Sequence, residues 1–68
     1  MTLYYVNRNE QPNHDHEVHE WGCQWIPKGE NRIFLGVFDS CDDAVKRARD
    51  YYERANGCVH CSPACHTT

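Results

Sequence analysis

The chain has 68 residues, a mass of 8.0 kDa and a formal net charge of −3 at pH 7. A chain of this length forms one domain, and its core supplies only about 3–5 kcal/mol, so we expect a staple: a metal ion, disulfides or a partner chain. No apolar run approaches the ~20 residues of a membrane-spanning helix. The negative charge disfavours nucleic acid as a partner, because nucleic-acid binders present a basic surface. The small size also disfavours a self-contained enzyme, which needs a walled pocket.

Three segments predict an antiparallel sheet within residues 1–38. The first, Leu3–Val6, is a short run of β-forming residues. The second and third, residues 17–26 and 32–38, are separated by a five-residue turn cluster and predict a hairpin. Strict alternation along residues 17–26 places four side chains on one face. They are His19, Trp21, Cys23 and Trp25, and we expect the two tryptophans to pack in the core against a helix.

A helix is predicted over residues 40–56. Ser40 has the residue type of an N-cap, and Asn56-Gly57 is typical of a helix end. Between them runs one narrow apolar stripe with helical spacing. Its members are Cys41, Ala44, Val45, Ala48, Tyr52 and Ala55. Charged residues on the other face are spaced to pair with one another, which favours a solvated face over an anionic partner.

The last segment, residues 58–66, reads CVHCSPACH and has neither a strand nor a helix period. Cys58, Cys61 and Cys65 have spacings that allow three thiolates to bind one tetrahedral zinc ion. The fourth ligand must come from His66 or from a distant position. The best distant candidates are His19 and Cys23, which lie on one predicted strand face. Such a ligand would tie the tail to the sheet and supply the missing stabilisation.

Other uses of the cysteines remain open. The chain has five, an odd number, so a full disulfide framework would leave one thiol unpaired. Cys58 and Cys61 form a C-x-x-C pair, but the pair follows the helix, whereas a redox motif precedes one. Iron–sulfur ligation is disfavoured because the spacing differs from the ferredoxin pattern. Cys41 starts the apolar stripe, which favours core packing, although an oxidising environment could link it to Cys23.

The His/acid segment HDHEVH contributes no second predicted site. His14 and His16 alternate onto the face opposite His19, so the three imidazoles cannot meet one ion on a regular strand. We therefore expect His14 and His16 to be solvated.

Several of these motifs together resemble a family of short, uncharacterised bacterial proteins. They are H-E-V-H at 16–19, Cys23, L-G-x-F at 35–38, C-x2-A-V-x2-A at 41–48 and N-G-C-x2-C-x3-C-H at 56–66. The resemblance covers almost the whole chain and implies a small, free-standing cytosolic protein. It implies no activity and no catalytic residues.

The sequence thus predicts a single α+β domain over residues 1–68. It has a three-stranded antiparallel sheet in 1–38, one helix in 40–56 and a Cys/His-rich tail in 58–66. We expect a cytoplasmic, zinc-stabilised interaction or regulatory module that binds no membrane and no nucleic acid, with an unknown protein partner. The alternative is a thiol redox or disulfide-stapled protein using Cys58 and Cys61.

Overall fold

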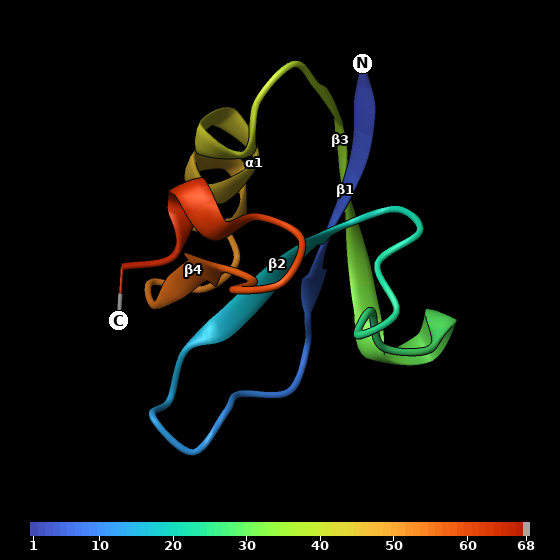
Figure 1. The fold of residues 1–68 in the computed structure, drawn as a ribbon. Coiled ribbons are helices and arrows are strands. Elements are labelled where there is room, and N and C mark those ends of the chain that lie inside the picture. The colour runs from blue at the N-terminus through green and yellow to red at the C-terminus, as the bar shows by residue number, and fades with distance from the viewer. Residues whose placement is uncertain (68) are drawn as a thin grey trace.

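The computed structural model describes residues 1–67, which form one sheet and one α-helix; Thr68, the end of the predicted domain, lies outside the described residues. The strands are β1 (Thr2–Asn7), β2 (His16–Glu20), β3 (Arg32–Phe38) and β4 (Ala55–Gly57). The helix is α1 (Cys41–Ala48), and two 3-10 turns are η1 (Gly29–Asn31) and η2 (Pro63–Cys65). In Figure 1, α1 lies to one side of β1 and β3, with the C-terminal residues, in red, beside it and β4. Within residues 1–67, no helix has the length and apolarity to cross a membrane.

The strand order is β3-β1-β2-β4, so β1 lies at the centre of the sheet. It pairs antiparallel with both β2 and β3, whereas β4 pairs parallel with β2. The predicted α+β class is confirmed, but the predicted sheet of three antiparallel strands was wrong. The sheet has a fourth strand, β4, and this strand is parallel to its neighbour β2. The predicted hairpin was also wrong, because β1 separates β2 from β3. β1 takes that place since Tyr4 and Val6 are both buried and bring apolar side chains to the middle of the core.

The core lies between α1 and one face of the sheet. Ala44, Val45 and Ala48 are the buried residues of α1, as the apolar stripe predicts. From the sheet they meet Tyr4, Val6, Val18 and Leu35, with Cys41 and Tyr52 packed at the margin. Ser40 stands at the N-cap, although its side chain makes no capping hydrogen bond.

The helix is shorter than predicted. It ends at Ala48, and residues 49–52 continue only as hydrogen-bonded turns. Ala55, predicted as the last residue of the stripe, is buried in β4 instead. Asn56 and Gly57 do not stop the helix but pair with β2. Tertiary pairing outweighs the helical spacing here, because this segment covers an edge of the sheet that would otherwise expose its backbone groups.

The second strand is also shorter than predicted, and this moves both tryptophans. β2 ends at Glu20, and Gly22 adopts a φ of 94° that continues no strand. Trp21 and Trp25 are 58% and 55% exposed, so their expected place in the core was wrong. Cys23 leaves the strand as well and returns toward β2 through a turn, with its N–H donating to the Glu20 carbonyl at 3.1 Å.

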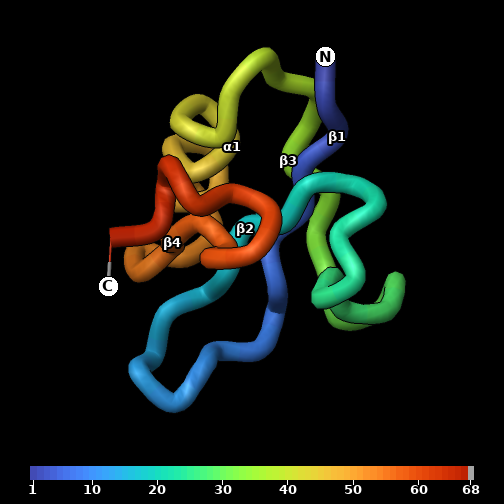
Figure 2. The backbone as a smooth tube through the Cα atoms, viewed as in Figure 1, coloured from blue at the N-terminus to red at the C-terminus, as the bar shows by residue number. Residues whose placement is uncertain are grey.

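The tail leaves β4, which is an edge strand, runs past β2 and turns back toward α1 (Figure 2). Side chains alternate between faces along a strand, so Val18 points to the core and His19 to the opposite face. Gly57 pairs with Val18 on β2. On the core side of Gly57, the space that a side chain would need is occupied by Cys65 of the tail. Cys58, the next residue, points to the His19 face. The route of the tail therefore separates the side chain of Cys58 from that of Cys65.

Candidate metal centre

Four side chains from three segments converge on the sheet face opposite α1. They are His19 of β2, Cys23 of the following turn, and Cys58 and Cys61 of the tail. One ligand atom from each lies within 4.8 Å of all the others. The site can therefore hold a metal ion with three sulfur ligands and one nitrogen ligand.

The separations of these atoms suit a tetrahedral ion. His19 Nδ1 lies 3.6 Å from Cys23 Sγ and 3.9 Å from Cys61 Sγ. Around zinc, with bonds of about 2.3 Å to sulfur and about 2.0 Å to nitrogen, tetrahedral angles place such atoms about 3.5 Å apart. These two nitrogen–sulfur distances exceed that value by about 0.1 and about 0.4 Å, so these atoms need to move only slightly to bind one ion.

Backbone N–H groups face the sulfurs of the tail. The Glu20 N–H donates to Cys61 Sγ at 3.4 Å, and the N–H groups of His60 and Cys61 donate to the Cys58 sulfur. Donors of this kind stabilise a thiolate and orient it. The turn from Cys58 to Cys61 is itself closed by a Ser62 N–H bond of 2.8 Å to the Cys58 carbonyl.

Burial disfavours the charged forms of Cys58, Cys61 and His19 and so shifts the pKa of each. It raises the pKa of the Cys58 thiol, and it raises the pKa of Cys61 to about 12. Burial and the neighbouring His60 lower the pKa of His19 to about 4, so the imidazole is neutral at pH 7 and can offer a lone pair. A divalent cation held by these residues would supply the positive charge that lets the buried thiols ionise.

Glu17 completes the surroundings of His19. The second ring nitrogen, Nε2, is buried and makes no hydrogen bond of good geometry within residues 1–67. Its nearest carboxylate oxygen is Glu17 Oε1, 3.5 Å away. Histidines that bind metals commonly direct the other ring nitrogen to a carboxylate, which fixes the ring and its tautomer. Glu17 was not among the predicted residues, although its position two residues before His19 on one strand face could have indicated it.

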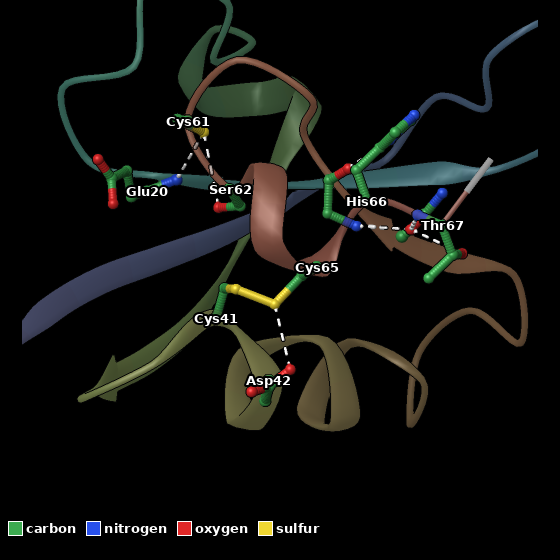
Figure 3. Close-up of a disulfide and its surroundings, with 10 residues drawn as sticks. Glu20, Cys41, Asp42, Cys61, Ser62, Cys65, His66 and Thr67 are labelled. Carbon is green, nitrogen blue, oxygen red and sulfur yellow. Dashed lines mark hydrogen bonds between the residues drawn. A yellow bond between two sulfur atoms is a disulfide. The ribbon is translucent and has the colours of Figure 1, made fainter.

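Cys65 is not part of this site. It forms a disulfide with Cys41 at the start of α1, with a Cα–Cα distance of 6.2 Å (Figure 3). The prediction that Cys65 shares the ion with Cys58 and Cys61 is corrected by this arrangement, because the tail has crossed the sheet edge before residue 65. The suggested link between Cys41 and Cys23 is replaced by the same bond. Figure 3 also shows Asp42 beside the disulfide, with Oδ1 3.3 Å from Cys65 Sγ.

The histidines outside the centre lie elsewhere. His66, considered as a fourth ligand, donates a hydrogen bond from Nδ1 to the Gly57 carbonyl at 3.0 Å and so belongs to the packing of the tail. His14 is exposed beside Glu10, as expected. His16 is only half-buried, and its ring stacks on Tyr52 with centroids 3.7 Å apart.

Comparisons with models of protein families, with curated proteins and with solved structures gave no significant match. The resemblance to short bacterial proteins therefore stays a prediction, and the residues of the site have to carry the functional argument.

Proposed function

We propose that this chain is a small module stabilised by one structural zinc ion, held by His19, Cys23, Cys58 and Cys61. The observation that carries the proposal is the convergence of three sulfur atoms and one imidazole nitrogen within 4.8 Å. Thiolate and imidazole ligands in a tetrahedral S₃N set are typical of zinc. Hard cations such as Ca²⁺ and Mg²⁺ prefer oxygen ligands.

The site supports a structural role rather than a catalytic one. Four protein ligands fill a tetrahedral ion, whereas a catalytic zinc site keeps one position for water or substrate. The ion would join β2, the following turn and the tail, and so add a cross-link to the β2–β4 pairing that already brings the tail beside β2. Such a module serves interaction or regulation, and we propose that role in place of an enzymatic one.

Thiol redox chemistry at Cys58 and Cys61 is the alternative. Two observations count against it. Cys58 is fully buried, and burial raises the pKa of both thiols, whereas a reactive cysteine needs an accessible thiolate. The Cys41–Cys65 disulfide is a separate use of cysteine in this chain. It cross-links the tail to α1 and contributes no ligand to the proposed zinc site.

Native mass spectrometry of protein made in zinc-supplied cells tests the proposal. Zinc binding adds about 63 Da, the mass of the ion less two protons, whereas each disulfide removes about 2 Da. We expect one zinc per chain in the wild type and in Cys41→Ser, and no stoichiometric zinc in Cys61→Ser. A wild-type chain that carries no zinc under reducing conditions, and whose two-dimensional NMR spectrum is unchanged by chelator, would overturn the proposal.

A further inference from the structure

The two edges of the sheet differ. β4 forms one edge of the sheet, and the tail folds over it. β3 forms the other edge, and its outer side has no partner strand within residues 1–67. β3 is the longest strand of the sheet, with seven residues. Phe34 and Val37 on this strand are 51% and 44% exposed. Long, apolar, unpaired edges of this kind are templates for pairing with another strand.

The backbone contacts of β1 show which groups of β3 point outward. The Arg8 N–H donates to the Asn31 carbonyl at 2.8 Å, so Asn31 directs its carbonyl toward β1, whereas its N–H donates to the Lys28 carbonyl. These groups alternate along an antiparallel strand, so those of Arg32 and Phe34 point away from the sheet.

At the other end of β3, backbone groups also point outward. The Leu3 carbonyl accepts a hydrogen bond of 2.8 Å from the Trp21 N–H, so Leu3 directs its backbone groups away from β3. Its partner across the ladder is Val37, whose own groups therefore point outward. Arg32, Phe34 and Val37 thus all present backbone groups at the free edge.

A bulge places these residues on a common face. The β1–β3 register shifts between Tyr4 and Tyr5, so that Phe34 lies opposite Tyr5 and Val37 lies opposite Leu3. Phe34 and Val37 consequently share the face opposite α1, although their spacing of three residues would put them on opposite faces of a regular strand.

With this bulge, β3 is complementary to itself. Two antiparallel copies related by a two-fold axis between Leu35 and Gly36 match both the faces and the outward backbone groups. In that register Phe34 lies opposite Val37, Ile33 opposite Phe38, and Arg32 opposite Asp39 of the second copy. Each pair occurs twice. The aromatic–aliphatic pairs and the pairs of opposite charge are those that stabilise antiparallel strands.

We propose that β3 pairs with β3 of a second copy of this chain and joins the two four-stranded sheets into one. The contact rests on the edge and one row of side chains, so the interface falls below about 1,200 Å² and the dimer is weak and transient. The ligand residues of the proposed zinc site lie in β2, the following turn and the tail, so dimer formation requires no change there. This inference goes beyond the proposed function, and either can fail without the other.

Sedimentation equilibrium of the full-length chain, from about 10 µM to about 1 mM, measures the association expected of a weak interface. We expect the average mass to rise from 8.0 kDa toward twice that value. Val37→Lys should lower the association constant at least tenfold, because it places two lysines at the edge. Tyr51→Lys is the matched control, since Tyr51 is 46% exposed but lies away from the sheet edge.

Two charge reversals test the register. Arg32→Asp and Asp39→Arg should each weaken self-association, because each places like charges opposite one another. An equimolar mixture of the two variants should associate more strongly than either alone, since every pair is then of opposite charge. Arg32 also contacts Tyr5, Trp21 and the Pro27 carbonyl, so zinc content and an NMR spectrum check that the variants fold.

A wild-type mass of 8.0 kDa at every concentration would overturn the inference. So would a dimer that Val37→Lys leaves unchanged, or a mixture of the charge variants that associates no better than its components.

Discussion

The tail uses its cysteines differently on the two faces of the sheet. On the face opposite α1, Cys58 and Cys61 meet the His19 ring and Cys23 at distances that leave room for an ion. On the helix side, four residues later, Cys65 is bonded directly to Cys41. The facing element sets the difference: β2 offers an imidazole and an N–H donor, whereas the start of α1 offers one thiol and the Asp42 carboxylate.

The comparison shows that cysteine spacing alone does not define a ligand set. Cys61 and Cys65 are close in sequence, yet the edge of the sheet passes between their side chains. The odd cysteine count is accounted for by the same division, since three cysteines are free and lie in the candidate metal site and two form the disulfide.

The largest effect should come from removing a buried ligand. Cys58→Ser should lose stoichiometric zinc and unfold the tail, because structural zinc contributes on the order of 10 kcal/mol in small peptides at neutral pH. Zinc assay and a two-dimensional NMR spectrum measure both effects. Val59→Ala, which alters an exposed side chain in the same turn without a ligand atom, is the control. A variant that holds one zinc and melts with the wild type would contradict the assignment.

Breaking the disulfide should have a smaller effect and leave the metal in place. Cys41→Ser should lower the free energy of unfolding by about 3 kcal/mol, because the bond closes a loop with a sequence separation of 24 and so restricts the unfolded chain. Urea unfolding of the oxidised wild type and the variant gives this difference. Loss of zinc from Cys41→Ser would show that the zinc site depends on the disulfide.

Gly57 connects the two faces, and a side chain there should disturb the helix side first. A Cβ at this position would lie 2.7 Å from Cys65 Cβ and 2.9 Å from the Ser62 carbonyl oxygen. Gly57→Ala should therefore cost about 1–3 kcal/mol of stability, as overpacking does in a closely packed site. Gly29→Ala, where a Cβ meets nothing within 4 Å, is the control. Equal thermal midpoints for the two variants would rule out the close approach.

The smallest expected change concerns the orientation of His19. Glu17→Gln removes the charge of the carboxylate near Nε2 and should weaken zinc binding by about 10–100-fold, the usual effect of losing such a neighbour. Competition with a chromophoric chelator measures the change in affinity. Glu53→Gln, a substitution at an exposed position away from the centre, should bind zinc like the wild type. If Glu17→Gln binds zinc as tightly as the wild type, Glu17 has no role in orienting His19.

Much of the centre could be predicted because its signals are local. The C-x2-C spacing identifies Cys58 and Cys61. The H-x3-C spacing offers His19 and Cys23 as alternatives for one distant ligand, whereas the structure brings both into the cluster. Cys65 could not be excluded from sequence, because its place depends on β4. That strand has three residues, Ala55–Gly57, without strong β-propensity, and only its pairing with β2 defines the faces.

The two wrong element boundaries have related causes. The helical stripe extends in sequence to Ala55, which is buried as expected but in a strand. The alternation of residues 17–26 continues past Gly22, where the positive φ ends the strand and leaves Trp21 and Trp25 exposed. In both cases the apolar repeat in the sequence extends past the residue at which the helix or strand ends.

X-ray absorption at the zinc edge tests the central claim most directly, because it counts the ligands by type. For reduced, zinc-loaded protein the account predicts three sulfur neighbours at about 2.3 Å and one nitrogen neighbour at about 2.0 Å. His19→Cys should change this to four sulfur neighbours, and Cys65→Ser should leave it unchanged. Four sulfur atoms around the ion in the wild type would return Cys65 or Cys41 to the site and contradict the account.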